Sequence, residues 1–175
     1  MIKTTTLITL ILLSLFSCRH TESNEFEPHK TIDESQFAPE YSQKNKVVGI
    51  KDGDTFVILI EGKEQVVRLE HIDCPEKKQP FGSKAKQFAS DLCFGKYVQL
   101  NHNNKLDRNK RLIAEVILEN GVNINKELVS SGLAWHFKKY SNNSDYSELE
   151  IKARTSAIGI WSEPNPIAPW EWRRK

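Results

Sequence analysis

Short runs rich in β-branched and aromatic residues, separated by turn residues, predict five β-strands in this chain. The predicted strands span residues 46–50, 55–60, 64–69, 97–100 and 112–118. A turn at residues 61–63, which contains Gly62, would join the second strand to the third. These two strands are therefore expected to form a hairpin.

Apolar residues at helical spacing lie between the third and fourth strands. The repeating positions are Ala85, Phe88, Ala89 and Leu92. The spacing i, i+3, i+4, i+7 predicts a helix over residues 83–93. Gly95 follows at the position where a helix commonly ends.

Two more helices are predicted after the fifth strand. The first covers residues 123–131, with Asn123 as its N-cap and Gly132 at its end. The second covers residues 146–158 and ends at Gly159. Three prolines beyond it predict an extended tail.

The order strand, strand, strand, helix, strand, strand fits a barrel of the OB type. The expected fold class is therefore mainly β with added helices (α+β), a five-stranded OB-fold β-barrel with three α-helices. We expect this folded domain to cover residues 45–175. Residues 18–44 are polar and without a clear period, which predicts a flexible tether.

The first 17 residues have the pattern of a signal peptide, with an apolar run over residues 7–16 after Lys3. The run ends in Leu-Phe-Ser-Cys, which resembles a bacterial lipobox with lipidation at Cys18. That predicts an exported protein of the cell envelope, tethered to a membrane by acyl chains. Ordinary secretion with Cys18 incidental is the alternative. An exported location also permits a disulfide between Cys74 and Cys93, on which the sequence alone does not decide.

Acids and arginines are concentrated in three short motifs of the strand region. The motifs are Asp52-Gly53-Asp54-Thr55, residues 68–76 and residues 107–111. The third strand would bring Asp73 back beside Asp54, and two carboxylates that close repel unless a cation lies between them. Oxygen ligands select a hard ion such as Ca²⁺. With Arg68 and Arg111 available to clamp a phosphate, the set indicates a metal-dependent phosphodiesterase.

The order and spacing of these motifs, with Gly132-Leu133-Ala134-Trp135 after them, resemble the staphylococcal nuclease-like (thermonuclease) family over about residues 46–173. The resemblance implies an OB-fold and calcium-dependent cleavage of DNA and RNA. It also implies that Asp54 and Asp73 bind Ca²⁺ through their side chains and Cys74 through its carbonyl. Glu76 would act as the general base, and the two arginines would stabilise the transition state. Family members of this kind leave 3′-phosphate ends.

This chain departs from the family pattern before Arg111, where Asn109-Lys110 replaces the usual Tyr-Gly. Lys110 can still donate to phosphate, and Tyr140 offers a phenol or a stacking face to a single strand. A solvated charge run with an incidental tyrosine is the alternative. The tryptophans are expected to pack in the core and tail, and His71 to be structural.

The formal net charge is only +2, so affinity for nucleic acid would need a local basic patch. We expect a monomer that prefers single-stranded DNA or RNA and reads little sequence, because its contacts are to the backbone. Two rival interpretations are a non-catalytic OB module that binds nucleic acid or protein, and a structural envelope lipoprotein. Retention of the full set of acids and arginines favours the nuclease.

Overall fold

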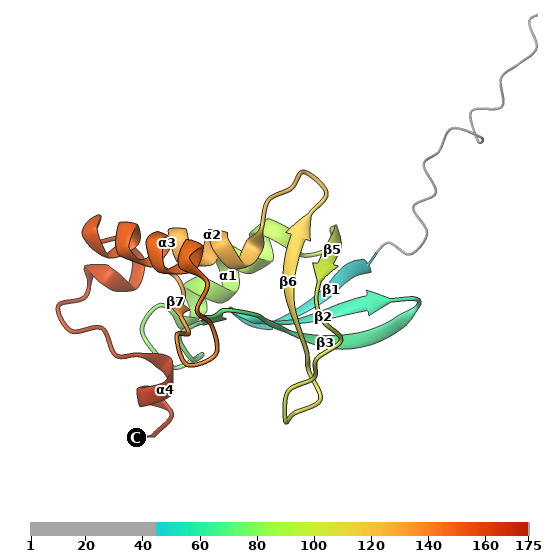
Figure 1. Cartoon of the computed structure of the whole chain (residues 1–175), viewed down its shortest axis with the longest axis horizontal. Helices are drawn as coiled ribbons and strands as arrows, with labels where there is room; N and C mark the ends of the chain where they lie inside the picture. Colours follow the sequence, from blue (N-terminus) through green and yellow to red (C-terminus); the bar gives the residue numbers. More distant parts are fainter. Residues whose placement is uncertain (1–44, 175) are drawn as a thin grey trace, which may run out of the picture. The chain divides into compact units, whose positions relative to one another are not determined.

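The computed structural model describes residues 45–174, and within them five strands close into a barrel (Figure 1). The strands are β1 (Asn45–Asp52), β2 (Thr55–Ile60), β3 (Lys63–Leu69), β5 (Tyr97–Asn101) and β6 (Leu112–Leu118). Around the barrel they follow the order β1-β2-β3-β6-β5, and β5 pairs with β1. Strands β3 and β6 run parallel, and the other pairs are antiparallel. The OB-type fold class predicted from the sequence is confirmed.

Three predictions from the sequence concern residues outside the described range. They are the signal peptide at residues 1–17, lipidation of Cys18 and the tether at residues 18–44. Within residues 45–174, no helix has both the length and the apolar character needed to cross a membrane. The N-terminal predictions therefore stay predictions.

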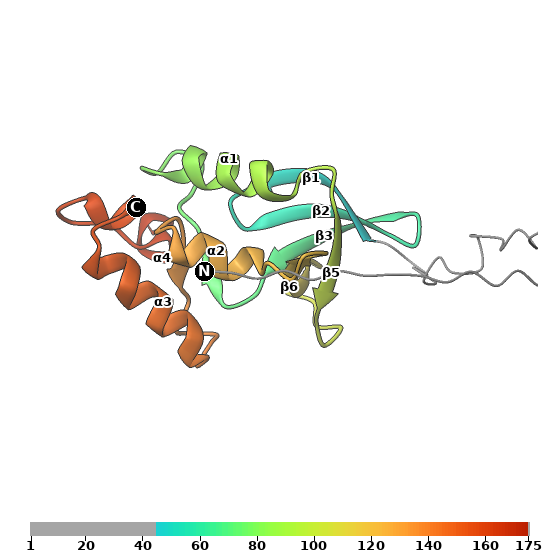
Figure 2. The same cartoon turned by 90° about the horizontal axis from the view of Figure 1, so that it is seen from above.

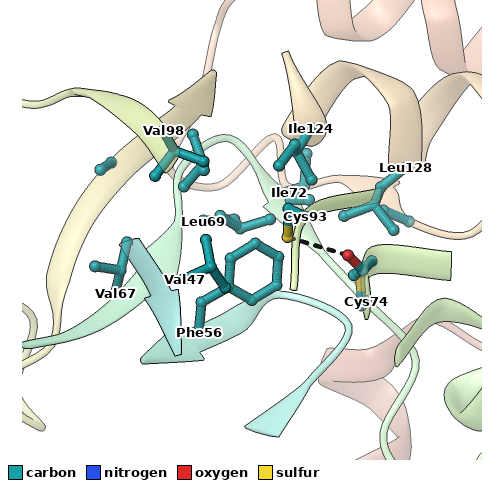
Figure 3. Packing of buried hydrophobic residues seen from close by; sticks show 14 of the residues in the cluster. Val47, Phe56, Val67, Leu69, Ile72, Cys74, Cys93, Val98, Ile124 and Leu128 are labelled. Atoms are coloured by element: carbon teal, nitrogen blue, oxygen red, sulfur yellow. Dashed lines mark hydrogen bonds between the residues drawn. The ribbon is translucent and has the colours of Figure 1, made fainter. Parts of the chain in front are cut away.

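Alternate residues of the barrel strands face one apolar core. Every second residue of β6, beginning with Leu112, is buried. Phe56 of β2 and Val67 of β3 are completely buried and pack with Ile124 and Leu128 in the same cluster (Figure 3). Burying a side chain of this size contributes about 1.5–3 kcal/mol, so the core is the main source of the barrel's stability.

Cys74 and Cys93 are both buried in this core as free thiols. The Cys93 Sγ donates to the Ala89 carbonyl oxygen at 3.0 Å, one turn back in the same helix. The disulfide that an exported location would permit is not formed. Burial raises the pKa of the Cys93 thiol to about 12, which keeps it protonated and unreactive.

Helices cover one side and one end of the barrel (Figure 2). Helix α1 (Gly82–Cys93) packs on β1, and α2 (Ile124–Ser130) packs on β6 and on α3 (Ser144–Thr155). As predicted, the Asn123 side chain caps α2 by accepting from the Lys126 backbone N–H at 3.1 Å.

Helix α3 begins two residues before the predicted start and ends three residues before the predicted end. Its N-cap is Asn143, whose side chain accepts from the Asp145 N–H at 3.0 Å. At the other end Ala157 takes a left-handed φ of 49°. The N–H groups of Ala157 and Ile158 then bond back to Arg154 and Ala153, which completes a Schellman cap before Gly159 is reached.

The sequence prediction missed a second, two-stranded sheet and gave the tail the wrong form. Strand β4 (Ile72–Asp73) pairs with β7 (Trp135–His136), and the pairing is too short to leave a periodic signal. The tail, predicted to be extended, contains a 3₁₀ turn (Gly159–Ser162) and a fourth α-helix, α4 (Pro169–Trp172). Proline at the first position of α4 is compatible with a helix start, so Pro169 begins a turn there.

Two glycines let the end of α2 meet the start of the tail backbone to backbone. Ile160 N–H donates to the Gly132 carbonyl oxygen at 2.8 Å. A Cβ on Gly132 would lie 2.3 Å from the Ile158 oxygen, and one on Gly159 would lie 2.1 Å from the Gly132 oxygen. Both glycines also have positive φ, so no other residue fits without movement of the backbone.

We expect Gly132→Ala to lower the free energy of unfolding by about 2–4 kcal/mol, since it adds a clash to an unfavourable φ. Gly121→Ala is the matched control, because Gly121 has a φ of +85° with open space around its Cβ position. It should cost only about 1 kcal/mol. Denaturant unfolding of both variants measures the difference, and equal costs would mean that the backbone contact has no energetic weight.

Candidate active site

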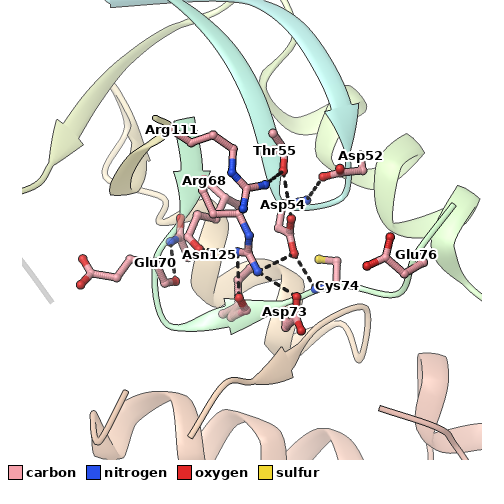
Figure 4. Close-up of polar contacts among 12 residues, drawn as sticks. Asp52, Asp54, Thr55, Arg68, Glu70, Asp73, Cys74, Glu76, Arg111 and Asn125 are labelled. Atoms are coloured by element: carbon pink, nitrogen blue, oxygen red, sulfur yellow. Dashed lines mark hydrogen bonds and ion pairs between the residues drawn. The ribbon is translucent and has the colours of Figure 1, made fainter. Parts of the chain in front are cut away.

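An open groove at the end of the β2–β3 hairpin collects the predicted acids and arginines (Figure 4). Asp54 directly precedes β2, and Arg68 of β3 lies opposite Thr55 in the strand register. Asp73 follows in β4. The hairpin is therefore the element that brings these positions together.

One guanidinium nitrogen joins the two predicted metal-binding carboxylates. The Nη2 of Arg68 lies 3.2 Å from Asp54 Oδ2 and 2.8 Å from Asp73 Oδ1. Its Nη1 donates to the carbonyl oxygens of Leu69 and Ile72 at 2.6 and 2.8 Å. Only 13% of the Arg68 side chain is exposed, so this cation is fixed within the protein.

Backbone and side-chain donors hold Asp54 on its other sides. The Cys74 N–H donates to Asp54 Oδ2 at 2.7 Å, and the Thr55 hydroxyl lies 3.2 Å from Oδ1. The backbone N–H of Asp54 donates to Asp52 Oδ1 at 3.2 Å. A Cβ on Gly53 would lie 2.9 Å from the Cys74 Cβ, so glycine is needed for this close approach. Asp54 is thus buried and rigid.

Arg111 reaches the same groove from the loop before β6. Its Nε and Nη2 each lie 2.7 Å from Asp107 Oδ2, and its Nη1 donates to the Thr55 hydroxyl at 3.2 Å. Asp107 Oδ1 also accepts the backbone N–H groups of Asn109 and Arg111. Burial acts to raise the pKa of Asp107, but these hydrogen bonds and the Arg111 charge lower it overall. One carboxylate therefore shapes the loop and orients the arginine.

Glu76 lies at the edge of the groove with 40% of its side chain exposed. Its backbone N–H donates to Gln79 Oε1 at 3.1 Å, and Gln79 Nε2 donates to the Ile167 carbonyl oxygen at 2.6 Å. Arg173 Nη1 donates to Glu76 Oε1 at 2.6 Å. The loop that carries Glu76 is thus tied to the C-terminal tail.

Negative charge is in excess at the centre of the site. Burial and the charge of Asp54 raise the pKa of Asp52 to about 6. Burial also raises the pKa of Asp73, although hydrogen bonds from Arg173 act in the opposite direction. Burial alone would lower the pKa of Arg68, but Asp54 and Asp73 raise it overall. A further cation between the carboxylates would relieve this imbalance.

The donor set fits a hard divalent cation. Because one nitrogen of Arg68 reaches both Asp54 and Asp73, the two carboxylates are close enough to share one cation. Oxygen donors of this kind suit Ca²⁺. Among residues 45–174, no three His, Cys, Asp or Glu side chains gather as a complete metal site. The set predicted from the sequence has two side-chain ligands, Asp54 and Asp73, and one main-chain ligand, the Cys74 carbonyl, so water or substrate oxygens would supply the remaining ligands of Ca²⁺.

The two predicted substrate-binding residues lie in different places. Tyr140 lines the groove with 69% of its surface exposed, and its ring packs edge-on against Phe137. Lys110 does not line the groove but a smaller hollow, which shares Asp52 and Arg111 with it. Tyr140 is therefore the better placed of the two to meet a strand that follows the groove.

Two histidines and three tryptophans pack around the site. His71 Nδ1 and His136 Nε2 each lie 2.9 Å from the Ser141 hydroxyl. Trp135 packs edge-on against Trp161 and Trp170. These contacts agree with the structural roles predicted for His71 and for the tryptophans.

Sequence reasoning missed two residues that act on the predicted set. Asp107 lies in the third motif, and its place four residues before Arg111 is itself a signal for an ion pair. Arg173 is close to Asp73 only in space, 100 residues away in sequence. No local pattern would have found it.

Comparison with known proteins shows the family of the chain. Residues 66–163 match the family model described as staphylococcal nuclease homologue, which covers more than half of the chain. The chain belongs to this family.

Several bacterial proteins are similar to the chain over most of its length. An "uncharacterized endonuclease" of Haemophilus influenzae is 44% identical over 131 residues, 74% of this chain and 72% of that protein. A "micrococcal nuclease" of Shigella flexneri is 38% identical over 141 residues, 75% of this chain and 80% of that protein. An "uncharacterized endonuclease" of Escherichia coli is 34% identical over 130 residues, 74% and 84% of the two chains.

The lysine that replaces the family glycine keeps a glycine-like conformation. Lys110 has a φ of 60°, and the turn closes through Lys110 N–H to the Asp107 oxygen at 3.0 Å. A left-handed residue with a Cβ costs about 1–2 kcal/mol. We therefore expect Lys110→Gly to raise the free energy of unfolding by about 0.5–1 kcal/mol. The gain is smaller than the relieved strain because glycine also makes the unfolded chain more flexible.

Lys105→Gly is the control for this experiment. Lys105 is exposed in the same loop and has no positive φ, so the change removes the same charge without relieving strain. It should leave stability unchanged or lower it. A loss of stability in both variants on denaturant unfolding would contradict the strain at Lys110.

Proposed function

We propose that this protein is a calcium-dependent nuclease that hydrolyses phosphodiester bonds of DNA and RNA. The observation that carries the proposal is the convergence of Asp54 and Asp73 on one nitrogen of Arg68, with Arg111 and Glu76 lining the same open groove. Membership of the staphylococcal nuclease homologue family supports nuclease activity in general.

Asp54, Asp73 and the Cys74 carbonyl would hold Ca²⁺. When bound, the ion supplies positive charge that polarises phosphate oxygens and favours ionisation of a coordinated water. The protein contributes a rigid carboxylate at Asp54 and a nearly dry one at Asp73, which is 2% exposed. Low exposure strengthens every charge interaction in the site.

Glu76 would accept the proton of the attacking water. Its carboxylate belongs to a loop next to Asp73 and faces the groove, where solvent can reach it. Gln79 fixes the backbone of that loop, so the carboxylate starts from a defined position. A positioned general base of this kind contributes about 10²–10⁴-fold to a rate.

Arg111 would stabilise the charge that develops on the phosphate. Its contacts to Asp107 and Thr55 use three of the five N–H donors of a guanidinium and leave two for phosphate oxygens. Asp107 holds the plane of the group, which lowers the cost of ordering it on binding. Arg68 supplies a second, buried positive charge beside the two aspartates.

The substrate would be a single strand lying along the groove, with Tyr140 offering its exposed ring to a base. Contacts to the backbone predict low sequence specificity, and the family pattern predicts 3′-phosphate ends. We further propose that the protein acts as a monomer outside the cytoplasm, anchored through Cys18 or secreted.

Glu76→Gln should lower kcat on single-stranded DNA by about 10²–10⁴-fold, because it removes the proton acceptor and keeps the shape. The assay compares the full-length protein and the variant with Ca²⁺ and with chelator. Glu119→Gln is the control, since Glu119 is exposed outside the groove. Activity should vanish with chelator and be unchanged in the control.

Two outcomes would overturn the proposal. Full activity in Glu76→Gln would remove the assigned role of that residue. Binding of DNA without cleavage, by folded protein in Ca²⁺, would point instead to a non-catalytic binding module.

A further inference from the structure

Arg173, at the end of α4, contacts both a predicted metal ligand and the predicted base. Its Nη2 lies 2.7 Å from Asp73 Oδ2, and its Nη1 lies 3.4 Å from Asp73 Oδ1 and 2.6 Å from Glu76 Oε1. One guanidinium therefore bridges the two carboxylates.

With Arg173 in this position, both oxygens of Asp73 are occupied. Oδ1 faces Arg68 and Oδ2 faces Arg173, and the side chain is almost completely buried. Because the Asp73 side chain is only 3% exposed, a divalent cation that binds it competes for the same space with these two arginines. The question is which of them moves.

The surroundings of the two arginines answer that question. Arg68 is 13% exposed and donates to two backbone carbonyls in addition to the aspartates. The side chain of Arg173 is 43% exposed, and among residues 45–174 its guanidinium bonds to the carboxylates of Asp73 and Glu76. Arg173 can turn into solvent once a bound cation replaces its charge, whereas Arg68 would leave unpaired carbonyls behind.

Other contacts fix the tail without help from Arg173. Gln79 Nε2 donates to the Ile167 oxygen at 2.6 Å, and Trp170 stacks on Phe137 with ring centroids 5.1 Å apart. Ala168 and Pro169 are buried. The backbone of α4 therefore stays docked when the Arg173 side chain moves, so the guanidinium remains close to the site.

We propose that Arg173 is a built-in competitor of the divalent cation. In the metal-free protein its guanidinium takes the place of the cation at Asp73, and cation binding expels it. The same movement frees Glu76, so the base becomes available only when the cation is bound. This inference rests on the cation site of the proposed function.

Calorimetric titration of Ca²⁺ alone into the full-length protein tests the proposal. Arg173→Gln should bind Ca²⁺ at least about fivefold more tightly than wild type, the lower end of typical coupling between sites. Arg174→Gln removes the same charge from the next, exposed residue and should change the affinity less than about twofold, because exposed charges are screened. Asp54→Asn, which removes a ligand, should abolish the titration.

Thermal unfolding supplies a second readout. Without metal, Arg173→Gln should melt at a lower temperature than wild type, because Asp73 and Glu76 lose a counter-charge. Saturating Ca²⁺ should then raise its melting temperature more than that of wild type. Arg173→Lys keeps the charge but cannot bond to both carboxylates with a planar guanidinium. Its melting temperature without metal should therefore lie between those of wild type and Arg173→Gln.

The outcomes separate this inference from the proposed function. If wild type binds Ca²⁺ and Arg173→Gln binds it equally or more weakly, Arg173 is not a competitor, and the nuclease proposal stands. If neither protein binds Ca²⁺, both proposals fail. Binding by Arg173→Gln alone, lost again when Asp54→Asn is added, would support the competition while refuting calcium use by the wild-type protein.

Discussion

The site depends on the buried ion pairs of Arg68. Two aspartates that are each less than 10% exposed meet at one of its nitrogens, and burial of a charge is costly unless it is paired. The strand register of β3 sets where Arg68 lies, and the hairpin sets where Asp54 lies. Removing the Arg68 guanidinium would leave the two buried carboxylates to repel each other.

The barrel and most of the candidate site were predictable because their signals are local. Runs of β-branched residues gave the strands, and Asn123 followed by Gly132 gave α2. The acids and arginines of the predicted site occur in short motifs, and the β2–β3 hairpin with the segments directly before and after it carries all of them except Arg111. The register of Thr55 against Arg68 then made their meeting a consequence of the strand order.

The features that could not be predicted from the sequence depend on tertiary packing or on an unusual backbone conformation. The two-residue pairing of β4 with β7 is too short to have a period. The early end of α3 depends on Ala157 accepting a left-handed φ, which its identity does not favour. The contact of Arg173 with Asp73 follows from the docking of Trp170 on Phe137, a tertiary event with no trace in local spacing.

Strand β4 has a consequence for how the protein opens. Asp73 belongs to a sheet separate from the barrel, and that sheet is completed by Trp135, a residue that also packs against the tail. Ile72 of β4 is buried in the barrel core, but the pairing of β4 with β7 spans only two residues in each strand, and so short a pairing can open at less cost than the whole domain. A partial opening of this second sheet would therefore disassemble the site and leave the barrel intact, so amide hydrogens of β4 and β7 should exchange before those of β2 and β3.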